Sequence, residues 1–249
     1  MKDIGIIMRR DYREHRKTAA FRIMLGIVAA VTIAASAGIS IALGLQSWPG
    51  EPEAGPVLGL FIGLVLYFLP LFILLAFVFA FASLPVTKEK ANGNIETLMA
   101  TPLSPRDLWL GKSLAIFLPA YVISVIAAVI VVLAVNLSAI LPAAGGFVLP
   151  GSALVLGLVI NPLLFLSLLL LTILLALADN PDIAIAPSFI LGFGLMMGMP
   201  VGLGLGWFDI RSWSFALWYL AGTGVFFGAV LFFSRTLTRQ NIVLSSRGT

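Results

Sequence analysis

Long uncharged apolar runs constrain the fold of this chain more than any other feature of its sequence. Five runs without Asp, Glu, Lys or Arg cover residues 23–50, 54–87, 113–178, 183–208 and 212–234. A helix needs about 20 apolar residues to cross a bilayer core of roughly 30 Å. The third run is long enough for two such helices and has a Pro- and Gly-rich break at residues 136–152. We therefore predict an all-α integral membrane protein with six transmembrane helices, at about residues 19–45, 57–84, 108–135, 153–177, 183–205 and 213–233.

The composition agrees with a membrane protein. Charged residues make up 10% of the 249 residues and hydrophobic residues 60%, whereas a soluble domain carries about a quarter charged residues. Little sequence lies outside the predicted spans, so we treat residues 1–249 as a single transmembrane domain. The chain has no cysteine, which excludes disulfides and thiolate metal ligands.

The positive charge of the chain has two interpretations. A net charge of +4 could indicate nucleic-acid binding, or it could reflect the excess of Lys and Arg that cytoplasmic loops carry in membrane proteins. With the N-terminus inside, every Lys and Arg except Arg211 falls on the cytoplasmic side of the predicted spans. We therefore expect an inner or plasma membrane protein with cytoplasmic N- and C-termini in a lipid bilayer, and no nucleic-acid partner.

Residues 1–18 are predicted to form an amphipathic helix on the membrane surface. Ile4, Ile7, Met8 and Tyr12 recur at helical spacing, and basic residues cover the remaining positions. This pattern is typical of a helix that lies in the membrane interface.

Two predicted spans carry a small residue at every fourth position. Such stripes let helix backbones approach closely in lipid. They favour either a moving or dimeric interface or ordinary packing within one subunit, and the sequence leaves both open. The residues are Gly26, Ala30, Ala34 and Gly38 in the first span, and Gly194, Gly198, Gly202 and Gly206 in and after the fifth.

Several kinds of chemistry are missing from the sequence. No predicted span holds an acidic or basic residue deep in the bilayer, as an ion-driven transporter generally needs. The only histidine, His15, lies outside the spans, and Gly111-Lys112-Ser113 lacks the upstream glycine of a phosphate-binding loop because Arg106 stands there. We expect no enzyme activity, cofactor or metal in this chain, so energy for any uphill movement must come from another polypeptide.

The polar segment at residues 85–112 is predicted to lie in the cytoplasm and to contain two helix starts. Asn92-Gly93-Asn94 favours a turn, and a short apolar-periodic helix follows it. Ser104 is a candidate N-cap, with Pro105 at the first helical position and Asp107 at the third. The second helix should therefore continue into the third span without a break.

This segment resembles the inner loop of type-2 ABC transporter permeases. The pattern E-x-x-x-G-x-x-E-x-L-x-x-x-P-x-S, with a Gly-Lys pair at the start of the third helix, is present from Glu89 to Ser104 and at Gly111-Lys112. The basic N-terminal helix, the six spans and the short outer loops extend the resemblance over nearly the whole chain.

The resemblance implies the membrane subunit of an exporter, with a cytoplasmic coupling helix that contacts a separate ATP-binding subunit. Two ATP-binding subunits, which hold ATP and Mg, would act on two permease subunits, normally a homodimer, and the second and fifth helices would border the substrate path. The residues assigned to coupling on this basis are Glu89, Gly93, Glu96, Leu98, Met99, Pro102, Ser104, Pro105 and Arg106.

Two questions stay open at this level. Glu89 and Glu96 could pair with basic residues of the ATPase or with Arg10 and Arg13 of the same chain. The alternative function is a non-transporting membrane anchor that uses an ABC-type ATPase for signalling or for mechanical work on lipid or cell-wall machinery.

Overall fold

The computed structural model describes residues 2–45, 54–82, 86, 89–90, 92, 94–178 and 184–246, and every element in these residues is helical. Six of the described helical stretches are long and apolar enough to cross a membrane. The prediction of an all-α, multi-pass membrane protein is therefore confirmed. The spans are α2 (Ala19–Gly44), α3 (Ala54–Phe81), α6 (Pro105–Val135), α8 to α9 (Gly151–Val155 and Asn161–Ala178), α10 (Ala186–Gly204) and α11 (Trp213–Phe233).

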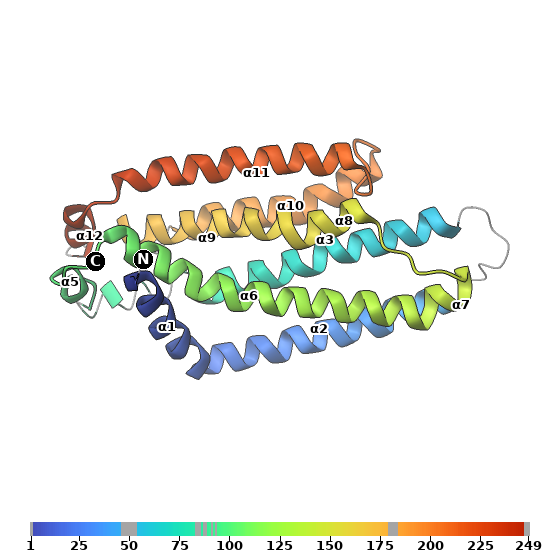
Figure 1. Cartoon of the computed structure of the whole chain (residues 1–249), viewed down its shortest axis with the longest axis horizontal. Coiled ribbons are helices and arrows are strands. Elements are labelled where there is room, and N and C mark those ends of the chain that lie inside the picture. Colours follow the sequence, from blue (N-terminus) through green and yellow to red (C-terminus); the bar gives the residue numbers. More distant parts are fainter. Residues whose placement is uncertain are drawn as a thin grey trace.

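The spans run side by side along the longest axis of the molecule (Figure 1). One end of this bundle holds α1 (Lys2–Lys17), α5 (Asn94–Met99) and α12 (Arg239–Ser246). The other end holds α7 (Leu141–Ala144) and the connection between α10 and α11. Basic residues of α1, α12 and the start of α6 therefore gather at one end, whereas Arg211 lies at the opposite end. We call the first of these the α1 end.

The core of the bundle is built around α6, which packs against α1, α2, α3 and α9. Its Trp109 is buried, and the indole Nε1 donates to the carbonyl of Leu170 in α9 at 2.8 Å. By contrast, α2, α10 and α11 leave most of their surface uncovered by the chain itself. These three helices form the periphery of the bundle.

Helix α6 continues further than we predicted. It passes beyond Val135 into a π-helical turn, η1 (Asn136–Ile140), and then into α7. The side chain of Asn136 stabilises this extension, because its Nδ2 donates to the Val132 carbonyl at 2.9 Å and its Oδ1 accepts from the Val148 amide at 2.8 Å. The expected break begins instead at Gly145, which has φ of 66°.

Helix α3 and the fourth span meet at a proline. Pro70 lies inside α3 and has no N–H, so the carbonyl of Leu66 lacks its helical donor. Gly157, in the π-helical turn η2 (Leu156–Ile160), lies so close that a Cβ there would overlap the Leu66 carbonyl oxygen. Asn161 Nδ2 donates to the next carbonyl, that of Tyr67, at 3.1 Å. The fourth span therefore packs directly on the backbone that Pro70 opens.

Candidate functional site

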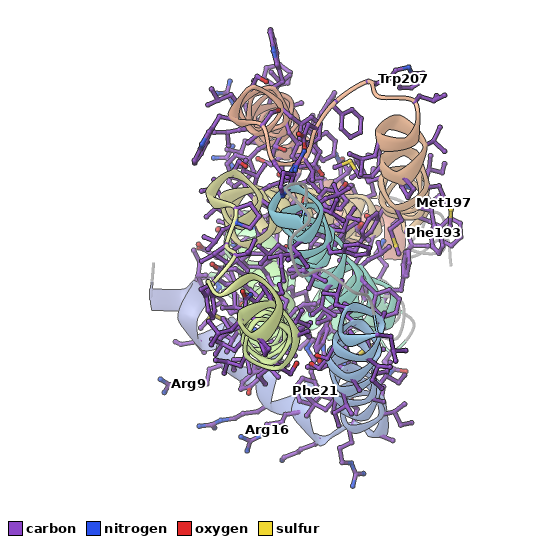
Figure 2. The ribbon with its side chains drawn as sticks, turned by 90° about the vertical axis from the view of Figure 1, so that its right-hand side faces the viewer. Arg9, Arg16, Phe21, Phe193, Met197 and Trp207 are labelled. Carbon is purple, nitrogen blue, oxygen red and sulfur yellow. The ribbon has the colours of Figure 1, made fainter. Side chains whose placement is uncertain are left out.

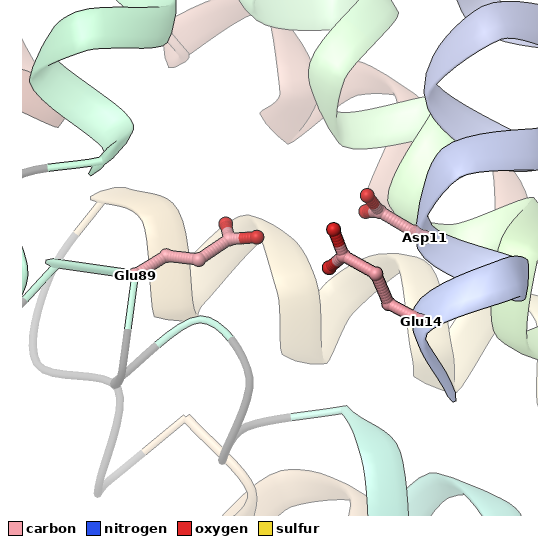
Figure 3. Close-up of side chains that lie close together, drawn as sticks. All are labelled: Asp11, Glu14 and Glu89. Atoms are coloured by element: carbon pink, nitrogen blue, oxygen red, sulfur yellow. The ribbon is translucent and has the colours of Figure 1, made fainter. Parts of the chain in front are cut away.

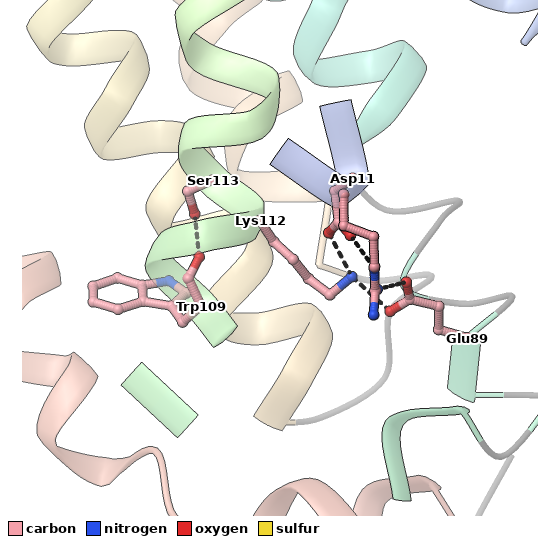
Figure 4. Close-up of polar contacts among 6 residues, drawn as sticks. Asp11, Glu89, Trp109, Lys112 and Ser113 are labelled. Carbon is pink, nitrogen blue, oxygen red and sulfur yellow. Dashed lines mark hydrogen bonds and ion pairs between the residues drawn. The ribbon is translucent and has the colours of Figure 1, made fainter. Parts of the chain in front are cut away.

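A buried ion-pair network joins three segments at the α1 end of the bundle. Lys112 of α6 places its Nζ 3.1 Å from Asp11 Oδ2 in α1 and 2.6 Å from Glu89 Oε2 (Figure 4). Arg10 contacts both acids as well, with Nε 2.9 Å from Asp11 Oδ1 and a terminal nitrogen 3.3 Å from Glu89 Oε1. Lys112 and Asp11 are each only 4% exposed. Charges buried to this degree are stable only when they are paired.

The glycine before Lys112 allows α1 to approach α6. A Cβ at Gly111 would lie 2.8 Å from Ile7 Cβ and 3.3 Å from the Ile4 carbonyl oxygen. The Gly111-Lys112 pair therefore has two physical roles: the glycine admits α1, and the lysine neutralises the acids that α1 and residue 89 bring with them. On the same turn, Ser113 Oγ donates to the Trp109 carbonyl at 2.9 Å.

Three carboxylates of this region could in principle hold a cation. Asp11, Glu14 and Glu89 each offer an oxygen within 4.8 Å of the others (Figure 3). However, the ammonium of Lys112 already lies between Asp11 and Glu89, and Arg10 contacts both. A divalent cation would have to displace Lys112, so the cluster is an ion-pair network.

His15 lies beside this network. Its ring centroid is 5.2 Å from that of Phe81, at the end of α3. Burial lowers the pKa of His15 below its ordinary value of 6.5, and the nearby charge of Lys112 acts in the same direction, while Asp11 and Glu14 oppose the shift. The neutral imidazole is therefore the form that the folded protein favours.

The short helix α5 is attached to the C-terminal helix. Ile95 and Met99 of α5 are buried, and Leu98 is half-buried. Arg239 of α12 donates to the carbonyl oxygens of Met99 at 3.3 Å and of Leu103 at 2.8 Å. Arg239 thus contacts the chain between α5 and α6 near both of its ends.

The predicted start of α6 is confirmed. Ser104 is its N-cap, with Oγ accepting from the Asp107 amide at 3.0 Å, and Pro105 occupies the first turn. The same hydroxyl lies 2.7 Å from Asp107 Oδ2 and donates to it. From Pro105 the helix runs without interruption to Val135.

Arg106 occupies an unfavourable position for a cation. It lies in the first turn of α6, where the helix dipole favours negative charge. Its side chain is exposed and makes no ion pair with any other residue that the structure describes. The helix dipole at this position therefore does not stabilise the charge of Arg106.

The other residues assigned to coupling differ in accessibility. Glu89 pairs with Arg10 and Lys112 of its own chain. Of the two alternatives left open by the sequence, a partner in the ATPase or one in the same chain, the structure has the second. Met99 is 5% exposed and is not accessible to a partner in this conformation, whereas Pro102 is exposed. Gly93 lies outside the described residues.

The small-residue stripes behave differently on the two helices. Gly26, Ala30, Ala34 and Gly38 all lie on the exposed side of α2, and neither glycine has a neighbour within 4 Å of an added Cβ. This stripe does not pack within the chain. On α10, a Cβ at Gly202 would overlap the Phe208 ring, and Gly206 follows the helix with φ of 70°.

The two remaining stripe glycines line a cavity. Gly194 and Gly198 border a space of about 200 Å³ between α3, α10 and α11, together with Tyr67 and Tyr219. The rings of these tyrosines lie 6.3 Å apart, and their buried hydroxyl groups have no hydrogen-bond partner elsewhere in the described part of the bundle. The cavity is therefore apolar apart from two phenol groups.

Sequence reasoning missed the pairing of Asp11 with Lys112 and the close contact at Gly157. From the sequence we interpreted Lys112 as a cytoplasmic positive charge and as part of the Gly-Lys pair at the start of the third span, without a partner in α1. The signal available in the sequence was Asp11, an acidic residue on a basic helix. It lies four residues after Ile7 and therefore on the same side of that helix. No pattern around Gly157 distinguishes it from the other glycines of the spans.

In comparisons with known proteins, no family model, no curated protein and no solved structure matches this chain. The fold defines a membrane protein with six candidate spans. Any more specific function has to be inferred from the chain's own residues and their arrangement.

Proposed function

We propose that this chain is the permease subunit of an ABC exporter, driven by ATP hydrolysis in a separate subunit. The observation that carries the proposal is the arrangement of α5 and α6. A short helix at the α1 end is joined through a capped, proline-initiated turn to a helix that spans the bundle. This is the geometry needed to transmit movement from a partner to the spans.

Arg106 supports a partner at this position. An exposed cation without an ion pair at a helix start is suited to an acidic group on another protein, since exposed charges steer and orient association. The exposed Pro102 and half-buried Leu98 lie on the same segment and would supply apolar contact. ATP and Mg would bind in the partner, which is expected in two copies.

The ion-pair network would keep α1 and the coupling segment in register. Lys112 and Arg10 connect α1, residue 89 and α6, so a displacement of residue 89 would also act on α1. In this proposal α1 is the interface helix on the cytoplasmic face of an inner or plasma membrane. The α1 end of the bundle, which holds both the first and the last described helices, is then the cytoplasmic end (Figure 1).

The cavity between α3, α10 and α11 is the proposed border of the substrate path. These are the second, fifth and sixth spans, and the two tyrosine hydroxyls are the polar groups that the cavity offers. An apolar, aromatic cavity favours amphipathic or lipid-like cargo. The exposed stripe of α2 is available to a second copy of the chain, which would complete a homodimer.

Charge reversal at Arg106 tests the proposal. The full chain, purified from its native membrane, should bring with it an ATP-binding protein and ATPase activity. Arg106→Glu should reduce that activity at least tenfold if one charge-assisted contact is lost, while the stability of the chain stays equal or rises because an acid suits the first helical turn. Arg16→Glu, an exposed reversal on α1, is the matched control and should retain the activity.

Two outcomes separate the proposal from other functions. Absence of any ATP-binding protein from the purified wild-type complex would reject it. ATPase activity that no exported compound stimulates would favour the alternative, a membrane anchor that performs mechanical work without transport.

A further inference from the structure

A groove on the outside of the bundle lies between α1 and α6. Its volume is about 410 Å³, and its floor consists of apolar side chains of α6, among them Leu114, Leu118, Pro119 and Val122. Helix α1 closes one end with Arg9 and Tyr12. The groove therefore has an apolar body and a single polar, positively charged end.

The polar end belongs to an uncompensated basic face. Arg9, Arg13 and Arg16 are spaced three and four residues apart on α1, which places them on one side of the helix. All three are exposed, and none makes an ion pair with another described residue, whereas the neighbouring Arg10 is paired. Figure 2 shows Arg9 and Arg16 projecting outward from the bundle.

The apolar end continues into the surface that α6 presents to the membrane. Leu118 is 41% exposed and Val122 52%, and Ile126, one turn further, is 54% exposed. These residues follow one another at four-residue spacing, so they form a continuous track along the helix. A hydrocarbon chain that enters the groove can therefore run along α6 toward the middle of the bilayer.

We propose that this groove binds one anionic phospholipid. The phosphate contacts the guanidinium of Arg9, with the Tyr12 hydroxyl as a second donor, and one acyl chain lies over Leu118 and Val122. An anionic lipid fits because the adjacent basic face attracts negative headgroups and Arg binds phosphate through paired hydrogen bonds. The inference rests on the membrane fold and is independent of the proposed transport function.

Native mass spectrometry of the full chain tests this site. The purified protein is equilibrated with phosphatidylcholine and phosphatidylglycerol of identical acyl chains, and the retained lipids are counted. The wild type should retain one phosphatidylglycerol in preference to phosphatidylcholine. Arg9→Gln should weaken that preference about tenfold, the loss expected for one charge-assisted contact.

Two further variants make the result specific to the groove. Arg16→Gln removes the same charge from the same face of α1 but does not line the groove, so it should leave the preference unchanged. Val122→Phe fills the track at an exposed position and should reduce retention of both lipids. Equal effects of Arg9→Gln and Arg16→Gln, or equal retention of the two lipids by the wild type, would overturn the proposal.

Discussion

At the level of single residues, the central feature is how the charge of Lys112 is neutralised. Lys112 contacts two acids from segments far apart in the sequence, and all three groups are largely buried. Lys112→Met should lower the free energy of unfolding by about 3–5 kcal/mol, because it leaves Asp11 and Glu89 buried with only Arg10 to compensate them. Denaturant titration in detergent micelles measures this change.

A second variant separates charge from packing. Asp11→Asn combined with Lys112→Met removes one charge of each sign and should be more stable than Lys112→Met alone. An unfolding midpoint of Lys112→Met equal to that of the wild type would show that the network does not hold α1 against α6.

His15 should make stability depend on pH. Its folded-state pKa is lowered below 6.5 by burial, so below that value the unfolded chain binds more protons than the folded one. Stability should therefore fall as pH decreases through about 6.5, the ordinary pKa of histidine. His15→Gln should lose this part of the dependence. Thermal unfolding at several pH values measures it, and identical pH profiles for the two proteins would refute the assignment.

At the scale of residues, prediction succeeded where the signal is local. The N-cap Ser104, followed by Pro105 and Asp107, is a short pattern with a direct physical cause, and the structure has it. The partner of Glu89 depends on where α1 packs, which no local pattern specifies. The same limit explains why the role of Lys112 was not foreseen.

At the scale of helices, the closest packing occurs at a glycine outside both predicted stripes. Gly157→Ala should destabilise the fold by about 1–3 kcal/mol, because its Cβ would overlap the Leu66 carbonyl and force α3 and the fourth span apart. Gly26→Ala is the matched control, since nothing lies within 4 Å of its added Cβ. It should change stability by less than about 0.5 kcal/mol.

Unfolding of the two alanine variants in the same detergent measures this difference. Equal stability of Gly157→Ala and the wild type would mean that α3 and the fourth span are not held by this contact. A Gly26→Ala variant that unfolds early as a monomer would instead show that the α2 stripe packs inside the chain.

The presence of the six spans was easier to predict than the residue at which each helix ends. The six spans follow from the length of the apolar runs, and α11 has the predicted bounds. The extension of α6 through η1 was not foreseen, because the Pro- and Gly-rich composition of residues 136–152 favours a loop. The decisive interactions are those of the Asn136 side chain with Val132 and Val148, which require the folded geometry.

At the scale of the whole molecule, the connected network of ion pairs lies at the α1 end, together with α5 and its attachment to α12. At the opposite end, Arg211 pairs with Asp209 of the same connection between α10 and α11 at 2.8 Å. The sequence predicted this asymmetry from charge alone. It did not predict that α1, residue 89 and α6 form one connected unit, because that connection depends on the approach of α1 at Gly111.

The central claim is that movement enters at α5 and reaches the far end through α6. The chain has no cysteine, so Trp207→Cys places a single thiol reporter at the far end, at a position that is 73% exposed. The measurement is the rate of thiol labelling in the complex with the proposed ATP-binding partner, with and without ATP. The comparison is a chain with two glycines inserted between Leu103 and Ser104, which interrupts the rigid connection.

We predict that ATP changes the labelling rate at residue 207 in the uninterrupted chain, and that the glycine insertion abolishes this change while the partner still binds and hydrolyses ATP. A labelling rate that does not respond to ATP, or one that responds equally in the chain with the insertion, would contradict the proposed transmission from α5 through α6.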